Sequence, residues 1–368
     1  MDFSLKGLFK GFEMLGKKEQ SVLGVDIGSS SIKIVQLKKE KERAILETYG
    51  EIATGPYADL KVGQTAKLSE DAVVTVLKDV LKEANAKAKT VAVAIPLKSS
   101  FVITVNLPFS PDKDIAEVIQ MEARRYVPVP ISEAELDWWI IPAMAGLEKN
   151  ASVEEKRRFT QVLLVAIHKD IINFYKNIIS KANLKARAYE IESFSMVRSC
   201  LAKESSPVAI MDFGASTTKL AVVDYGIIRS SYTINHGSQD LTLALSRSLN
   251  IDFSRAEEMK REIGLSDLPE NKEVVAVLEP ILDYIFTEAN RFVKDFHQKY
   301  HHSIGKIILT GGGSLLKGLI DFTVKRFTIE VELADPFAKV EYPAFLANSL
   351  KGVGMNFSIA IGLALREL

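Results

Sequence analysis

Two stretches of the chain share one pattern of apolar and polar positions. Residues 22–37, VLGVDIGSSSIKIVQL, read as an apolar strand, a tight polar turn and a second apolar strand. Residues 208–223, VAIMDFGASTTKLAVV, repeat the same order. Because β-branched apolar residues on both sides of a glycine turn are typical of hairpins, each stretch predicts two paired strands. Two such hairpins so far apart predict a duplicated domain with a ligand between its halves.

Each predicted hairpin places groups suited to phosphate at its turn. An aspartate ends the first strand, a glycine and small residues form the turn, and a lysine (Lys33 or Lys219) follows. The glycine lets a ligand approach the converging backbone N–H groups, and the lysine adds a point charge suited to phosphate. The candidate residues are Asp26, Gly28, Ser29, Ser30, Ser31 and Lys33 in the first hairpin, and Asp212, Gly214, Ala215, Ser216, Thr217 and Thr218 in the second.

A third glycine turn lies closer to the C-terminus. Residues 307–314, IILTGGGS, read as a strand and a turn, and a helix-like run follows over residues 315–327. The free N–H groups and the dipole at a helix N-terminus favour nucleotide phosphate. Gly311, Gly312, Gly313 and Ser314 are therefore further candidates for nucleotide binding.

The rest of the chain predicts a mixture of helices and strands. Residues 1–20 predict a short amphipathic helix on a membrane or a partner, and a frayed or locally docked terminus is the alternative. Adjacent Trp138 and Trp139 should face opposite sides of a strand. The further predicted strands are 44–52, 90–95, 101–107, 136–141 and 161–167, and the further predicted helices are one that begins after Ser69, 111–126, 170–182, several that run to about 302, and 357–365.

Composition removes several classes of protein. The chain has 368 residues, and its 47 basic and 47 acidic residues give a formal net charge of zero, which does not favour a nucleic acid as partner. The single cysteine, Cys200, excludes a disulfide framework and favours a reducing, cytoplasmic compartment. The five histidines show no metal-ligand spacing, and the sequence contains no nucleophile elbow.

The two hairpins and the glycine turn resemble the phosphate-1, phosphate-2 and adenosine motifs of the superfamily of actin, Hsp70 and sugar-kinase ATPases. Their spacing and the long insert after Pro96 resemble FtsA and, more closely, the PilM family of cytoplasmic actin-like proteins in type IV pilus assembly. The stretch ARRYVPVP at residues 123–130 resembles the PilM family in particular. The resemblance runs from about Val22 to the C-terminus.

This resemblance implies an α/β fold with actin-like (ribonuclease H-like) duplicated domains, a nucleotide cleft between them and an inserted subdomain of the FtsA and PilM type. The closing helix leaves no room for the long linker and C-terminal membrane helix of FtsA. The implied parts are an N-terminal segment of residues 1–20, a first domain of 21–98 and 188–206 with the closing helix 355–368, the inserted subdomain 99–187, and a second domain of 207–354 that includes a helical subdomain, 241–304.

The resemblance also implies roles for individual residues. ATP or ADP would occupy the cleft with Mg²⁺, which Asp26 and Asp212 would hold through waters. Glu192, followed by Glu190, lies closest to the place of a residue that positions the attacking water, and a simple helix-capping role is the alternative. Glu257 and Lys260 match ribose and adenine contacts, with a solvated helix face as the alternative. Gly237 belongs to a glycine turn that resembles one in FtsA and MreB.

The implied function is a nucleotide-binding scaffold at the inner face of the inner membrane, where the family binds the cytoplasmic N-terminal peptide of PilN. Other platform proteins and self-assembly are further implied partners. Ala215 stands where related chains often carry an acidic or hydroxyl residue, which argues for slow or absent ATP hydrolysis. The alternatives are an FtsA-like membrane-associated filament of cell division and a phosphotransferase of the sugar-kinase or acetate-kinase type.

Overall fold

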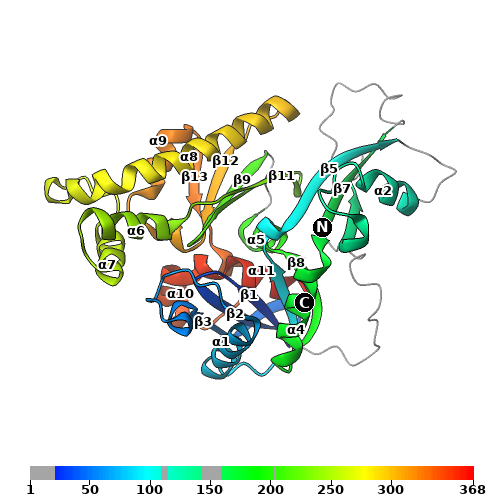
Figure 1. Cartoon of the computed structure of the whole chain (residues 1–368), viewed down its shortest axis with the longest axis horizontal. Helices are drawn as coiled ribbons and strands as arrows, with labels where there is room; N and C mark the ends of the chain where they lie inside the picture. The colour runs from blue at the N-terminus through cyan, green and yellow to red at the C-terminus, as the bar shows by residue number, and fades with distance from the viewer. Residues whose placement is uncertain (1–20, 109–114, 142–158, 203, 205) are drawn as a thin grey trace.

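The computed structural model describes residues 21–108, 115–141, 159–202, 204 and 206–368. These residues form three sheets with helices packed around them (Figure 1). The expected helix in residues 1–20 lies outside the described residues, as do the first residues of the helix expected over 111–126. Among the described residues, no helix has the length and apolar character needed to span a membrane.

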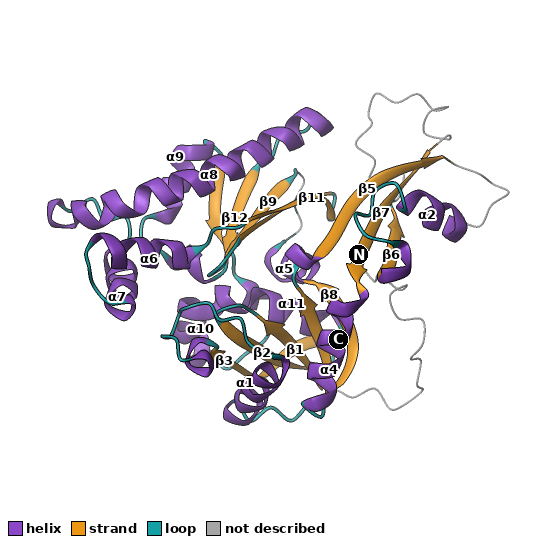
Figure 2. Ribbon diagram, in the orientation of Figure 1, coloured by secondary structure: helices purple, strands orange, loops and turns teal. Residues whose placement is uncertain are grey.

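Two five-stranded sheets repeat one topology, which confirms the predicted duplication. In each sheet three antiparallel strands are followed by two strands parallel to the third. The first has the order β3 (Arg43–Ala53), β2 (Ser31–Glu40), β1 (Ser21–Ile27), β4 (Thr90–Ile95), β8 (Lys185–Ile191), and the second has the order β11 (Ile227–Ile234), β10 (Thr218–Asp224), β9 (Val208–Phe213), β12 (Lys306–Thr310), β13 (Glu330–Leu333). Figure 2 shows β1, β2 and β3 together in one part of the molecule and β9, β11 and β12 together in another.

A smaller antiparallel sheet is formed by the chain segment between β4 and β8 of the first large sheet. We call the first large sheet with its helices the first half of the molecule, and the second large sheet with its helices the second half. Its strand order is β5 (Ser100–Pro108), β7 (Phe159–His168), β6 (Ala134–Ile140), and helix α2 (Ile115–Ala123) packs on it. Trp138 packs against the core beneath α2, whereas Trp139 packs against a separate buried cluster to which all three sheets contribute. The two indoles therefore face opposite sides, as predicted.

Helices cover both large sheets. Those of the first half are α1 (Glu70–Glu83), α4 (Lys169–Lys181), α5 (Glu192–Cys200), α10 (Ala347–Val353) and α11 (Ser358–Arg366), and those of the second are α6 (Ser238–Ser248), α7 (Phe253–Ile263), α8 (Lys272–Tyr300) and α9 (Leu319–Phe327). The helix predicted from residue 315 begins only at Leu319, because Gly318 has a left-handed φ of 79° and interrupts the run.

The chain returns to the first sheet earlier than the expected subdomain boundary at residue 187. Helix α4 packs against α1, and β8 pairs with β4, so residues 169–191 lie with the first sheet. Residue 187 falls inside β8. The strands and helix of the small sheet span residues 100–168.

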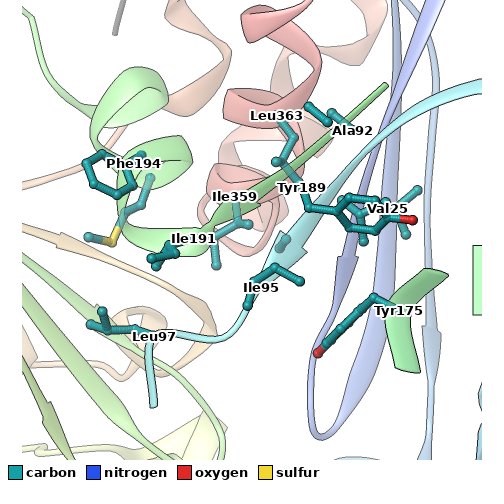
Figure 3. Packing of buried hydrophobic residues seen from close by; sticks show 14 of the residues in the cluster. Val25, Ala92, Ile95, Leu97, Tyr175, Tyr189, Ile191, Phe194, Ile359 and Leu363 are labelled. Atoms are coloured by element: carbon teal, nitrogen blue, oxygen red, sulfur yellow. The ribbon is translucent and has the colours of Figure 1, made fainter. Parts of the chain in front are cut away.

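The closing helix α11 fixes the core of the first half. Figure 3 shows Ile359 and Leu363 of α11 in one buried cluster with Val25 and Ala92. A side chain on Gly24 of β1 would lie 1.9 Å from the main-chain oxygen of Ala360, so the helix rests directly on the strand. Because β1 ends in the first polar turn, this close packing holds the turn in a fixed place.

Candidate functional site

The two predicted hairpins place their turns against each other. The Gly28 N–H donates to the Ser31 carbonyl at 3.0 Å, and the Gly214 N–H donates to the Thr217 carbonyl at 3.1 Å. The two turns therefore have the same backbone hydrogen bond. They meet where the Ser29 hydroxyl donates to the Ser216 hydroxyl at 2.9 Å, a contact between the two halves.

A cleft of about 820 Å³ lies between the halves and is bounded by both turns. This volume falls within the range of small-molecule sites. The predicted residues that line it are Asp26, Gly28, Ser29, Ser30, Ser31, Lys33, Glu192, Asp212, Gly214, Ala215, Ser216, Thr217, Glu257, Lys260, Gly311, Gly312 and Gly313.

Three predicted residues, Thr218, Gly237 and Ser314, do not line the cleft but contact the backbone next to the residues that do. The buried Thr218 hydroxyl donates to the His236 carbonyl at 2.9 Å, and the buried Ser314 hydroxyl donates to the Thr310 carbonyl at 2.5 Å. Gly237 precedes α6, and a Cβ there would lie 2.4 Å from the Ala215 carbonyl oxygen. These residues hold the turns in shape without facing the cavity.

The third glycine turn closes onto the second hairpin. Gly311 has a φ of 82°, and a Cβ there would lie 2.2 Å from Oδ1 of Asp212. A Cβ on Gly313 would lie 2.7 Å from the ring of Phe213 and from its carbonyl oxygen. Both glycines are needed for the approach of the two turns, and together they leave main chain as the wall of the cavity.

A lysine links acidic residues of the two halves. Lys219 Nζ lies 3.1 Å from Oδ2 of Asp212 and 2.9 Å from Oε2 of Glu192. Burial disfavours the charged lysine, but Asp212, Glu192 and Asp26 together raise its pKa above the usual range. Burial raises the pKa of Asp26 from 3.8 to about 6, although Lys33 and Lys219 oppose that shift.

Lys33 has different partners. Its Nζ donates to the Ser31 hydroxyl at 2.8 Å and lies 3.7 Å from Oε1 of Glu51. The Ser31 hydroxyl donates to the same Glu51 oxygen at 2.7 Å, and Asn356 Nδ2 donates to the other at 3.3 Å. Lys33 is thus held at the mouth of the first turn by residues of its own half.

Glu257 and Lys260 form a second charged pair in the cleft, on α7. Lys260 Nζ lies 2.7 Å from Oε2 of Glu257 and donates to the Ser238 carbonyl at 3.1 Å and the Thr242 hydroxyl at 2.9 Å. The side chains of Lys260 and Glu257 are only 8% and 15% exposed, so a solvated helix face is wrong for these two residues. Burial lowers the pKa of Lys260 despite the attraction of Glu257.

The two candidate glutamates near α5 have separate environments. Glu190 is buried, and its carboxylate accepts hydrogen bonds from both terminal nitrogens of Arg198, at 2.7 and 2.8 Å. Arg198 also donates to the Gly362 carbonyl of α11, so Glu190 joins helices within the first half. Glu192 lines the cleft. The Leu97 N–H donates to its Oε1 at 2.7 Å, and Lys219 Nζ donates to its Oε2 at 2.9 Å.

These residues fit a nucleotide better than they fit Mg²⁺. Two hydroxyl-rich turns and three glycines without side chains form a cradle for phosphate and sugar. Magnesium takes one or two carboxylates and keeps several waters. Lys219, however, already occupies Asp212 and Glu192, and within the described residues no group of three or more His, Cys, Asp or Glu side chains is arranged to hold a metal ion. The expected Mg²⁺ at Asp26 and Asp212 therefore stays a prediction that this geometry does not favour.

Sequence reasoning missed two partners of these charges. Glu51 lies opposite Lys33 in the register of β2 and β3, and Glu192 reaches Lys219 from the other half. The contact with Glu51 could have been predicted from the pairing of the two predicted strands, because Glu51 lies directly across from Lys33. The Glu192 contact joins separate domains, so strand pattern gives no such signal.

Comparisons with known proteins agree with this architecture. A family model described as "Type IV pilus assembly protein PilM" matches residues 24–368. Cell division protein FtsA of Neisseria meningitidis serogroup B is 21% identical over 356 residues, covering 87% of this chain and 85% of that protein. FtsA of Streptococcus pneumoniae serotype 2 is 22% identical over 367 residues, covering 89% and 78%.

Solved structures show the same fold at low sequence identity. A "PilM-PilN type IV pilus biogenesis complex" superposes with a TM-score of 0.78 at 24% identity, covering 95% of this chain and 99% of that one. MreB 5 of Spiroplasma citri bound to AMPPNP superposes with a TM-score of 0.52 at 12% identity, covering 94% and 95%. The fold is therefore actin-like, as the sequence predicted.

Proposed function

As the chain belongs to the PilM family of type IV pilus assembly proteins, we propose that it is a nucleotide-binding scaffold of the inner-membrane pilus platform. One observation carries the nucleotide part of this proposal. Two phosphate-type turns and a triple-glycine turn meet around a single cleft of about 820 Å³, although they lie far apart in the sequence. A scaffold built only for protein contacts would have no need of such a cradle.

In the proposed complex, ATP or ADP lies between the halves. The hydroxyls of Ser29 and Ser30 and the charge of Lys33 meet the phosphates from the first half, and Ser216 and Thr217 meet them from the second. Gly311 to Gly313 provide main chain against the ribose and α-phosphate, and Glu257 with Lys260 lies at the nucleoside end. Because the nucleotide contacts both halves, it would stabilise their closed arrangement.

We propose that hydrolysis is slow or absent. Hydrolysis needs a positioned water and stabilisation of the charge that develops on the phosphates. Glu192 is the candidate for placing that water, but one of its oxygens accepts from Leu97 and the other from Lys219. Ala215 contributes no side-chain group that could accept a proton. The cleft is then a structural or regulatory site.

The proposed partner is the cytoplasmic N-terminal peptide of PilN, held in a groove beside the small inserted subdomain. One solved structure that this chain resembles is a PilM-PilN complex, which supports this partner for a chain of the same family and fold. The proposed location is cytoplasmic, at the inner face of the inner membrane, with peripheral association. Other platform proteins or copies of this chain are further proposed partners, and nucleic acid is not.

Calorimetric titration of ATP and of ADP tests the nucleotide part. We expect saturable binding by the wild type and its loss in Gly311→Ala, since the added Cβ would meet Asp212 at 2.2 Å. Gly352→Ala is the matched control, because Gly352 also lines the cleft but a Cβ there meets no protein atom within 4 Å. Circular dichroism checks that each variant is folded. A wild type that binds neither nucleotide would contradict the proposal.

The scaffold part is tested by titrating a synthetic peptide from the PilN N-terminus, together with a phosphate-release assay. We expect peptide binding with little phosphate release. ATP-dependent sedimentation with lipid and no peptide binding would favour the FtsA-like filament instead. Fast release of phosphate or transfer to a small acceptor would favour a phosphotransferase. Each of these two outcomes contradicts the adaptor role.

A further inference from the structure

Lys219 occupies a position where carboxylates from both halves converge. Asp212 ends β9 in the second half, and Glu192 opens α5 in the first. The ammonium lies 3.1 Å and 2.9 Å from their oxygens, and the lysine side chain is only 17% exposed. One cation thus joins the two halves at the base of the cleft.

The carboxylate oxygens around Lys219 lie close to the ammonium or to main chain. The second oxygen of Glu192 accepts from the Leu97 N–H at 2.7 Å. Oδ1 of Asp212 lies so close to the Gly311 backbone that a Cβ there would be 2.2 Å away. Each carboxylate therefore has one oxygen on Lys219 and the other against main chain.

A nucleotide site that contains acidic residues needs positive charge to offset the repulsion between carboxylates and phosphates. A triphosphate and three nearby carboxylates, Asp26, Glu192 and Asp212, repel one another, and a divalent cation commonly offsets that repulsion. For Mg²⁺ to bind the two carboxylate oxygens that Lys219 contacts, Lys219 would have to give up two charged hydrogen bonds in a largely buried place, which is strongly unfavourable. Lys219 already supplies positive charge there.

Resting on the nucleotide site proposed above, we propose that Lys219 is a built-in counter-cation that takes the place of a divalent metal ion, so that the cleft binds ATP or ADP without requiring Mg²⁺. The register of the second hairpin explains how the chain achieves this. Lys219 is the direct cross-strand partner of Asp212 in β9 and β10, so the cation is fixed beside its carboxylate by the strand pairing itself.

The duplication provides an internal control for this assignment. Lys33 is the cross-strand partner of Asp26, as Lys219 is of Asp212. Lys33 nevertheless bonds the Ser31 hydroxyl and lies 3.7 Å from Glu51 of its own sheet. Only Lys219 of this pair links the two halves, so only its removal should create a need for metal.

The test is calorimetric titration of ATP into the full chain, once in excess EDTA and once in MgCl₂. We expect the wild type to show dissociation constants within about threefold of each other, a difference below ~1 kcal/mol. Lys219→Met should bind about tenfold more weakly in EDTA, through loss of a charge and its hydrogen bonds. Mg²⁺ should restore most of that loss. Lys33→Met should weaken binding by a similar factor in both media.

A second readout needs no nucleotide. Lys219→Met leaves Asp26, Glu192 and Asp212 without their shared cation, so MgCl₂ alone should raise the melting temperature of this variant but not that of the wild type or of Lys33→Met. Should Lys219→Met fail to fold, Lys219→Arg retains the charge and should bind ATP in EDTA as the wild type does. A Lys219→Arg variant that binds only with Mg²⁺ would overturn the proposal.

The outcomes separate the two proposals. A wild type that binds ATP only when Mg²⁺ is present overturns the role of Lys219 and leaves the nucleotide site standing. Binding in EDTA that is equal for the wild type and Lys219→Met overturns it as well. A wild type that binds ATP in neither medium overturns the nucleotide site itself.

Discussion

The two hairpins have the same backbone but make different use of their charges. Each has a glycine N–H bonded back across the turn, at 3.0 and 3.1 Å, and each pairs an aspartate with a lysine across the strands. In the first, Lys33 turns toward Ser31 and Glu51 of its own half. In the second, Lys219 bonds its own Asp212 and crosses to Glu192 of the other half.

The duplication gives the two hairpins the same backbone conformation, whereas the neighbouring elements determine which partners each lysine has. Strand pairing alone would make the two lysines equivalent. The environment differs because β3 brings Glu51 to the first lysine, whereas α5 brings Glu192 to the second. The first lysine is thereby left at the phosphate turn, and the second neutralises the base of the cleft.

We expect the largest effect on stability from replacing Lys219, and a much smaller one from replacing Lys33. Lys219→Met leaves two bonded, buried carboxylates without their cation and should lower the free energy of unfolding by roughly 3–5 kcal/mol. Lys33→Met removes a charge that has one hydroxyl partner and a carboxylate 3.7 Å away, and it should cost about 1 kcal/mol. Urea unfolding of both variants at low salt measures the difference. Equal losses would mean that Lys219 has no special place.

The next effect concerns Asp26, where burial outweighs the opposing charges of Lys33 and Lys219. In the folded protein burial raises the pKa of Asp26 to about 6, above its ordinary value of 3.8. A carboxyl shifted in this direction stabilises the fold below about pH 4 and loses that contribution as the pH rises through about 6.

Asp26→Asn removes this titration. Without nucleotide, the variant should therefore gain stability relative to the wild type between about pH 4 and pH 7, by roughly 1–3 kcal/mol. Denaturant midpoints measured across that range check the sign. Asp212→Asn is the contrast, because it removes a partner of Lys219 and should destabilise at pH 7. A constant difference between Asp26→Asn and wild type would refute the pH dependence.

A smaller effect tests what the hairpins share. A Cβ on Gly28 would lie 2.8 Å from the Ser31 carbonyl oxygen, and one on Gly214 would lie 2.9 Å from that of Thr217. Each Gly→Ala change should force a similar shift of the turn and cost roughly 1–2 kcal/mol. Thermal unfolding of the two variants should give matching losses. Losses that differ severalfold would show that the turns are not equivalent in energy.

The smallest effect falls on the contact between the turns. Ser29→Ala removes the 2.9 Å hydrogen bond to Ser216, which is partly buried and neutral, and should cost about 0.5–1 kcal/mol. The same change should speed hydrogen exchange of amides in both turns, because the bond joins the halves. Exchange measured by mass spectrometry would show this, and unchanged exchange in either turn would argue against a closing role.

Much of this fold was readable from the sequence because the signals are local and repeated. Alternating apolar residues around Gly28 and Gly214 predicted both hairpins, and the Gly311 turn predicted the third wall of the cleft. The pattern even placed Trp138 and Trp139 on opposite faces. These features depend on strand period and on turn chemistry within a few residues.

What the sequence did not show depends on contacts between distant segments. The return of the chain to the first sheet is decided by the pairing of β8 with β4, which lies about a hundred residues earlier in the sequence. The break at Gly318 depends on a left-handed φ that a helical pattern does not register. The contact between Lys219 and Glu192 forms only when the two halves are packed together. The Mg²⁺ ion expected beside Asp212 was therefore inferred without the knowledge that Lys219 contacts the same carboxylate.

The most direct measurement is a crystal structure of the full chain with ATP and Mn²⁺, with an anomalous map to locate the metal. We expect Lys219 Nζ to stay within hydrogen-bond distance of Asp212 and Glu192 beneath a nucleotide bound between the two hairpins. Any manganese peak should then lie on the phosphates, away from these carboxylates. A peak between Asp26 and Asp212 with Lys219 turned aside would contradict the built-in cation, and an empty cleft would contradict the nucleotide site.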